Sequence, residues 1–245
     1  MRHDRVWQGA EVTRGYLEGV RGAIPLAHQQ MDVMLRVIHK ARQEVVSFLD
    51  LGCGDGVLAR AVLESYPDAK GVLFDFSEPM LDVAREKMSD NPNLIFIQGD
   101  YSTPDWVNVL QAHAPFEVIV SGYSIHHQPD EIKRRLYQEI YELLAPGGVF
   151  LNMEHVSPED DWVEGLFDDM MIDSMFAYHQ HTGGTDSHAT FADKHHHRED
   201  KHANILAPVD AQCNWLREIG FVHVDCYFKV FELALFGGIK EKSGR

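Results

Sequence analysis

The chain has 245 residues and a formal net charge of −16 at pH 7, with 22 lysines and arginines against 38 aspartates and glutamates. This length is enough for one large domain with a sizeable core, and the negative charge disfavours DNA or RNA as a substrate. The three cysteines lack zinc-site spacing and no apolar run approaches about 18 residues, so we expect a cytoplasmic protein with no membrane partner.

Residues 1–44 precede the first predicted strand. Glycines and a proline break this segment before a helical pattern at residues 31–38. We expect the segment to cross the ligand-binding edge of the fold and to place Trp7, Tyr16 and Arg21 near a cofactor or an acceptor. The alternative is that the two aromatic side chains pack and Arg21 forms a surface ion pair.

A strand, a glycine-rich turn and a helix follow in residues 45–66. The strand ends at Leu51, and the turn Gly52-Cys-Gly-Asp-Gly56 lets the backbone pass close to a ligand. The dinucleotide fingerprint needs its third glycine one residue later, so this spacing does not suit a pyrophosphate. Asp50 and Asp55 flank the turn, and their charges favour a ligand with an ammonium group.

Strands and helices alternate through residues 45–155, which predicts a parallel sheet with helices on both faces. The expected strands are 45–51, 71–75, 94–98, 116–121 and 148–154, and the expected helices are 57–66, 78–88, 104–112 and 130–144. Two further carboxylates lie at strand ends. Asp75 is suited to the two hydroxyls of a ribose, and Asp100, beside Tyr101, is suited to an adenine. Each of these features alone is common in turns and strand ends that bind nothing.

Taken together, these motifs resemble the class I methyltransferases that use S-adenosylmethionine (SAM). Their first motif is matched by residues 50–56, their ribose-binding acid by Asp75 and their adenine-binding acid by Asp100, and the resemblance covers roughly residues 40–155. It implies a Rossmann-like α/β fold with a mostly parallel seven-stranded sheet, SAM as cofactor and S-adenosylhomocysteine (SAH) as product. The expected cofactor-binding residues are Arg21, Asp50, Gly52, Gly54, Asp75, Phe76, Met80, Asp100, Tyr101 and Ser121.

The candidate catalytic residues follow the fourth and fifth strands. His126 and His127 come after the fourth strand, and Glu154 and His155 end the fifth. A histidine is suited to taking a proton from an acceptor near neutral pH, so His126, Glu154 and His155 are the predicted catalytic residues. The alternative is that these histidines cap a helix or pack against the sheet.

Residues 156–205 are expected to form a helical cap on the acceptor side. A methionine-rich helix at 166–175 supplies Met170, Met171 and Met175 as a candidate apolar wall. His195, Glu199 and His202 share one helical face, but we expect a solvated histidine-rich surface and no metal. Residues 206–245 are expected to complete the same domain with a helix at 211–218 and a hairpin of two strands, which the resemblance implies are antiparallel.

Residues 21–25 and the closing stretch 227–240 are also similar to carboxy-SAM synthase and its methyltransferase relatives. In that synthase an arginine of the late cap pairs with the extra carboxylate of the cofactor, and Arg198 is a loose counterpart. The tyrosine expected after Ile24-Pro25 is replaced near Leu26-Ala27.

The favoured function is methyl transfer from SAM to a small-molecule acceptor by in-line displacement. Carboxy-SAM synthesis, a SAM-binding sensor or assembly protein without an acceptor, and a nicotinamide dehydrogenase remain as alternatives, and the sequence leaves a homodimer open.

Overall fold

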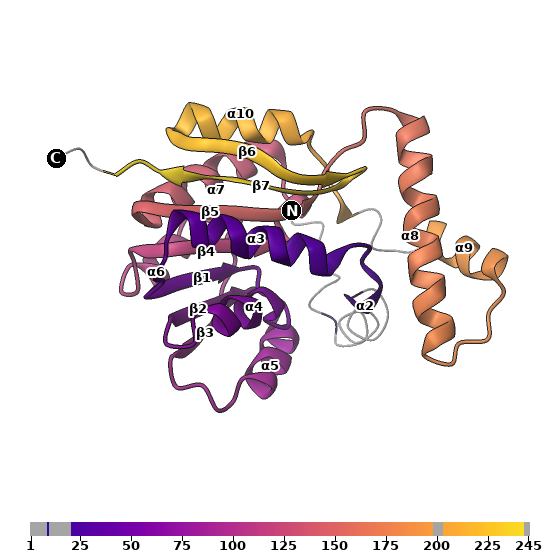
Figure 1. Cartoon of the computed structure of the whole chain (residues 1–245), viewed down its shortest axis with the longest axis horizontal. Coiled ribbons are helices and arrows are strands. Elements are labelled where there is room, and N and C mark those ends of the chain that lie inside the picture. Colours follow the sequence, from indigo (N-terminus) through magenta and orange to yellow (C-terminus); the bar gives the residue numbers. More distant parts are fainter. Residues whose placement is uncertain (1–8, 10–20, 198–202, 243–245) are drawn as a thin grey trace.

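In the computed structural model, the described part of the chain comprises residue 9, residues 21–197 and residues 203–242. Its centre is one seven-stranded sheet with the strand order β3-β2-β1-β4-β5-β7-β6 (Figure 1). The strands are β1 (Ser47–Leu51), β2 (Lys70–Asp75), β3 (Leu94–Gln98), β4 (Phe116–Gly122), β5 (Leu144–His155), β6 (Phe221–Val230) and β7 (Leu233–Lys240). The predicted Rossmann-like fold class is confirmed.

The first five strands are parallel neighbours, and β7 pairs antiparallel with both β5 and β6. Strand β1 pairs with β2 on one side and with β4 on the other, so the strand order reverses there. In an open α/β sheet, such a reversal leaves a crevice beyond the carboxyl ends of the strands. The predicted binding residues follow these strand ends.

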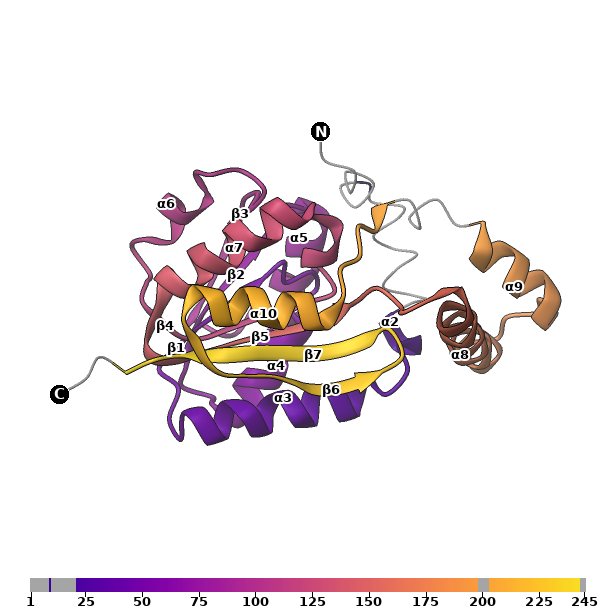
Figure 2. The same cartoon turned by 90° about the horizontal axis from the view of Figure 1, so that it is seen from above.

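Helices cover both faces of the sheet, as Figure 2 shows from above. Apolar side chains of α3, α4 and α5 form one core with the sheet, and those of α6, α7 and α10 form the other. The helices are α2 (Arg21–Ala23), α3 (Ala27–Ala41), α4 (Val57–Ser65), α5 (Glu78–Lys87), α6 (Trp106–Leu110), α7 (Asp130–Leu143), α8 (Asp161–His181), α9 (His188–His196) and α10 (Val209–Ile219). Because both faces of β1 and β2 are buried, the sequences of these strands are mostly apolar and do not alternate with polar residues.

Helices α8 and α9 are set apart from the layered core at one end of the sheet (Figures 1 and 2). The helix predicted at 166–175 is longer in the structure and spans 161–181. It begins earlier than predicted because Asp160 accepts a hydrogen bond from the backbone N–H of Val163 and so caps its N-terminus. Helix α9 ends at His196, and residues 199 and 202, which were predicted to share a helical face with His195, lie outside the described part of the chain. Among the helices described, none combines the length and the apolar character needed to span a bilayer.

Candidate functional site

A cavity of about 470 Å³ lies at the carboxyl ends of the parallel strands. Its walls come from the glycine turn after β1, the ends of β2, β4 and β5, and helix α8. This volume lies within the range of about 300–1,000 Å³ that is usual for small-molecule sites. The glycine turn and Asp75 line one part of the cavity, and three of the histidines after β4 and β5 line another.

The glycine turn needs its glycines for two different reasons. Gly52 and Gly54 both have positive φ, at 67° and 53°. A Cβ on Gly52 would lie 2.0 Å from the Oγ of Ser124, so Gly52 allows the segment after β4 to approach. A Cβ on Gly54 would meet no atom within 4 Å. Since Gly54 lines the cavity, the space beside it is open to a ligand that passes against the backbone.

Asp75 is held in one orientation by two backbone donors. Its Oδ2 accepts from the N–H of Gly54 and its Oδ1 from the N–H of Ser77, both at 2.8 Å. A carboxylate offers about four lone-pair sites in all, and Asp75 lines the cavity beside Phe76 and Met80. This geometry fits two hydroxyls of a ribose.

Asp50 and Asp55 have different surroundings. Asp50 lines the cavity, and its Oδ2 accepts from the backbone N–H of Ala59 in the first turn of α4 at 2.9 Å. Asp55 is buried, and its Oδ2 lies 2.7 Å from the Nζ of Lys87 and 3.3 Å from a guanidinium nitrogen of Arg60. The expectation that both acids attract an ammonium group therefore needs correction, because two cations already balance Asp55.

Asp100, Tyr101 and Ser121 are not among the residues that line the cavity. The Tyr101 ring is buried in the core, and its hydroxyl lies 2.7 Å from the Oγ of Ser124, so the ring is not exposed for stacking on an adenine. The Ser121 hydroxyl donates to the carbonyl of Leu51, and a carboxylate oxygen of Asp100 accepts from the backbone N–H of Ser102. These three side chains hold the turns around the cavity.

Several predicted residues lie outside the described part of the chain. These are Trp7 and Tyr16 of the first segment, and Arg198, Glu199 and His202 of the cap. The backbone of Arg21 lies in α2, but its side chain is not described. The cavity is therefore defined by the glycine turn, Asp75, Phe76 and Met80 on one side and by the histidines on the other.

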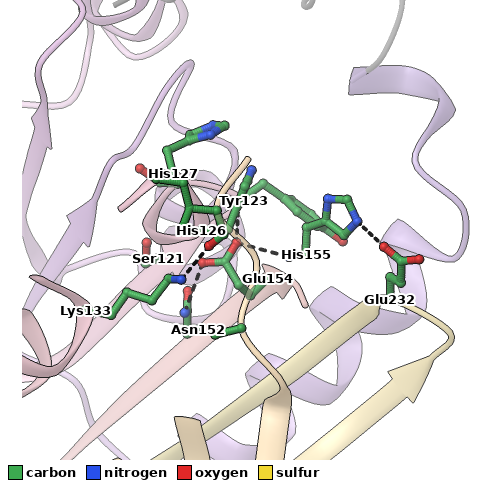
Figure 3. Close-up of polar contacts among 12 residues, drawn as sticks. Ser121, Tyr123, His126, His127, Lys133, Asn152, Glu154, His155 and Glu232 are labelled. Atoms are coloured by element: carbon green, nitrogen blue, oxygen red, sulfur yellow. Dashed lines mark hydrogen bonds and ion pairs between the residues drawn. The ribbon is translucent and has the colours of Figure 1, made fainter. Parts of the chain in front are cut away.

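His126 and Glu154 form a buried pair at the strand ends (Figure 3). The Nδ1 of His126 lies 2.5 Å from the Oε1 of Glu154, which also accepts from the backbone N–H of His155. His126 lines the cavity and Glu154 does not, so the imidazole lies between the carboxylate and the cavity. Burial raises the pKa of Glu154 to about 7 and lowers the pKa of His126 well below its usual range.

His155 forms a second pair of the same kind. Its Nε2 lies 2.6 Å from the Oε2 of Glu232, a residue at the β6–β7 turn that is only 2% exposed. His155 lines the cavity, and the centroid of its ring lies 5.8 Å from that of His126. Figure 3 shows the two histidines directed to different acids.

A buried polar layer, formed by Asn152, Tyr137 and Gln212, supports the Glu154 carboxyl. Its Oε2 accepts from the Nδ2 of Asn152 at 3.2 Å, and the same nitrogen lies 3.4 Å from the hydroxyl of Tyr137. The Tyr137 hydroxyl donates to Gln212 of α10 at 2.6 Å. The Glu154 carboxyl is thus anchored through Asn152 of the same strand to α7 and α10, which fixes the orientation of His126.

The chain segment that returns from α9 is fastened to the same histidines. The carbonyl of His126 accepts from the backbone N–H of Ile205 at 2.9 Å, and the Nδ1 of His127 lies 3.1 Å from the carbonyl of Ala203. Lys133 is fully buried and donates to the carbonyl of Ile205 at 2.5 Å and to Asp130 at 2.9 Å. These contacts couple the position of the return segment to the position of His126.

Helix α8 supplies an apolar wall to the cavity. The lining side chains recur along one face of the helix and are Phe167, Met171, Met175 and Tyr178. Met170, which was predicted with them, is not among the lining residues. His195 of α9 is buried and lines the cavity, whereas its neighbours His196 and His197 are exposed, so the histidine-rich stretch is not uniformly solvated as expected. The described residues contain no group of histidine, cysteine or acidic side chains that could hold a metal ion.

Sequence reasoning missed Lys133 and Glu232 as parts of the site. Tyr123 lines the cavity, and its hydroxyl donates to Gln30 of α3 at 2.6 Å. The one signal in the sequence concerns Lys133, which lies at an inward position of the amphipathic helix α7, where the other inward side chains are apolar. Nothing local marks Glu232, because its partner lies 77 positions earlier in the chain.

Residues 48–148 match the family model of a methyltransferase domain. Malonyl-(acyl-carrier protein) O-methyltransferase 1 of Ilyobacter polytropus is 31% identical over 111 residues, which are 45% of this chain and 38% of that protein. The carboxy-SAM synthase of Wolinella succinogenes is 29% identical over 193 residues, which are 76% of this chain and 73% of that protein. The chain thus aligns with well under two thirds of the first relative.

The solved structure of an O-methyltransferase family protein from Burkholderia thailandensis superposes with a TM-score of 0.61 at 16% identity. The superposition covers 86% of this chain and 56% of that one. At this identity the similarity concerns the fold.

Proposed function

We propose that this chain, whose residues 48–148 match a methyltransferase domain, is a class I SAM-dependent enzyme that transfers a methyl group from SAM to a small-molecule acceptor. The observation that carries the proposal is the single cavity that joins the glycine turn and Asp75 to the histidines. A methyl donor at one end and an acceptor at the other would therefore share one space from which water can be excluded.

The residues around the glycine turn fit SAM. The open space beside Gly54 accommodates a ligand against the backbone, Asp75 presents two carboxylate oxygens to the ribose hydroxyls, and Asp50 offers a negative charge to the ammonium group. Phe76 and Met80 supply apolar contacts beside them. When bound, SAM supplies a methyl group that its sulfonium has already activated.

His126 is the proposed base. Because Glu154 engages Nδ1, the proton of an acceptor hydroxyl is taken by Nε2, and the side chain of Asn204, which also hydrogen-bonds His126 and lines the cavity, lies beside this ring. Burial lowers the pKa of His126, so the ring is neutral and able to accept a proton near neutral pH. Above about pH 7, where Glu154 is ionised, its carboxylate stabilises the imidazolium, in the role that the carboxylate of a histidine–acid pair plays in other enzymes. The cap formed by residues 156–205 is proposed to close the acceptor side.

The proposal is tested by calorimetric titration of the protein with SAM and SAH. Asp75→Ala removes both carboxylate oxygens, and we expect at least a tenfold loss of affinity, about 1.4 kcal/mol. Asp82→Ala is the matched control, because Asp82 is exposed and pairs only with Arg85 in the described structure. No binding of SAM by the unaltered protein would contradict the proposal.

Carboxy-SAM synthesis is a second candidate, supported by the long alignment with the Wolinella succinogenes synthase. Mass spectrometry of the nucleotide that copurifies with the protein separates the two. A nucleoside heavier than SAM by the mass of CO2 would favour the synthase, and SAM or SAH alone would favour the methyltransferase.

A further inference from the structure

The acceptor side of the cavity contains one histidine–acid pair more than methyl transfer requires. His126 and His155 both line the cavity, and each is held by a different buried glutamate. Removing the proton of one acceptor hydroxyl occupies one base only. The inference below rests on the proposed function and concerns what the second pair does.

The second pair has unused hydrogen-bonding capacity. Glu232 is 2% exposed, and its Oε1 has no hydrogen-bond partner within the described residues. With Nε2 engaged by Glu232, His155 keeps Nδ1 as its second polar atom. Leu233, directly after Glu232, lines the cavity, so the pair lies at the cavity edge. Buried polar groups are normally satisfied, and a polar group on a ligand would satisfy the Nδ1 of His155, the member of the pair that lines the cavity.

A purely structural role does not account for the second pair. The end of β5 is already tied to the β6–β7 turn by the backbone hydrogen bond from Val156 to the carbonyl of Glu232, at 2.8 Å. The β5–β7 register also continues to the pair His155 and Leu233. The strands therefore remain paired without the side-chain contact, and a buried acid at this position adds desolvation cost to the fold.

The surroundings of the second pair are apolar. The His155 ring lies 5.1 Å from the ring of Phe167, centroid to centroid, and Met171 and Met175 continue the wall along α8. Thioether and aromatic side chains pack well against the faces of flat apolar molecules. The ring centroids of His126 and His155 are 5.8 Å apart, so both histidines can reach oxygens on one small framework.

We infer that the acceptor is an apolar compound with two oxygen functions, of which only one is methylated at a time. The hydroxyl beside His126 gives its proton to Nε2 and receives the methyl group. The second oxygen, a hydroxyl or a carbonyl, is bound by the His155–Glu232 pair and sets which hydroxyl reaches the donor. His155 is thus a specificity-determining residue for the reaction.

The test compares two matched probes, benzene-1,3-diol and 3-methylphenol, in which a methyl group replaces the second hydroxyl. Calorimetry with the SAH-bound protein measures the affinity for each probe, so the readout does not depend on turnover. We expect the diol to bind at least tenfold more tightly than the methylphenol. His155→Phe keeps a ring against Phe167, and with it we expect the ratio of the two affinities to fall to near one.

Two further variants complete the design. Glu232→Gln retains the size of the side chain, and we expect it to reduce the ratio to an intermediate value. His39→Phe, at an exposed position on α3, is the matched control and should leave the ratio unchanged. Equal affinity of the unaltered protein for both probes, or equal losses of both affinities in His155→Phe, would overturn the inference. Failure to bind SAM would instead refute the proposed function.

Discussion

Replacing Glu154 with glutamine should change how the stability of the protein depends on pH. The carboxyl is 1% exposed, and burial raises its pKa from 4.5 to about 7. In the unfolded chain the same group titrates near its ordinary value. Between these two pH values the folded state therefore holds a proton that the unfolded state has released.

The size of the effect follows from the two pKa values. A difference from 4.5 to about 7 corresponds to roughly 3 kcal/mol. Because the folded-state pKa is the higher one, this stabilisation of the folded state is complete below about pH 4.5. It is lost as the pH rises to about 7 and beyond. His126, whose pKa is lowered by burial, has the opposite effect below pH 6.5 in both proteins, so it cancels to first order in the comparison.

Glutamine at position 154 keeps the shape of the side chain and cannot ionise. Its amide presents one oxygen and one NH2 group, and the buried Oδ1 of Asn152 has no partner within the described residues. Rotation of the Asn152 amide would let that oxygen accept from the new NH2 group. That rotation takes the Nδ2 of Asn152 away from the Tyr137 hydroxyl and into the unpartnered place of its oxygen, a cost that does not vary with pH and so leaves the expected change in pH dependence unaltered.

Urea unfolding at 25 °C, followed by circular dichroism between pH 4.5 and 8.5, measures the difference. We expect the free energy of unfolding of Glu154→Gln, relative to the unaltered protein, to rise by about 3 kcal/mol across this range. Glu86→Gln, at an exposed position on α5, should run parallel to the unaltered protein. Parallel curves for Glu154→Gln would refute the reasoning, because they would mean that Glu154 is not held protonated in the fold.

Two further predictions concern the cofactor turn and the return segment of the cap. Gly54→Ala places a methyl group in the open space of the cavity, so we expect the affinity for SAM, measured by calorimetry, to fall at least tenfold. Gly183→Ala is the control for backbone strain, because Gly183 has a φ of 90° and equally open surroundings but lies outside the cavity. Lys133→Met removes a buried charge that lowers the pKa of Glu154 and His126 and leaves the carbonyl of Ile205 without its donor. We expect Lys133→Met to move the midpoint of the pH–rate profile to higher pH. Lys70→Met, at an exposed position, is the control and should leave the midpoint in place. An unmoved midpoint in Lys133→Met would show that Lys133 only supports the fold.

The pattern of residues along the chain was enough to predict the alternating strands and helices of 45–155 and the fold class. This is because each buried parallel strand requires an uninterrupted apolar run, and each helix requires an apolar face at its own period. The glycine turn could also be predicted from the sequence, since positive φ at Gly52 and Gly54 is a local requirement. Asp75 could be placed at the same edge because the carboxyl ends of parallel strands meet there.

Contacts between distant segments were decided only by the tertiary structure. Asp100 and Tyr101 follow a strand end as Asp75 does, yet the Tyr101 hydroxyl is turned to Ser124 in the core. The β5–β7 register sets His155 opposite Leu233 and so brings Glu232 within reach of its imidazole. Side-chain direction and strand register depend on packing between segments far apart in sequence, so no local pattern specifies them.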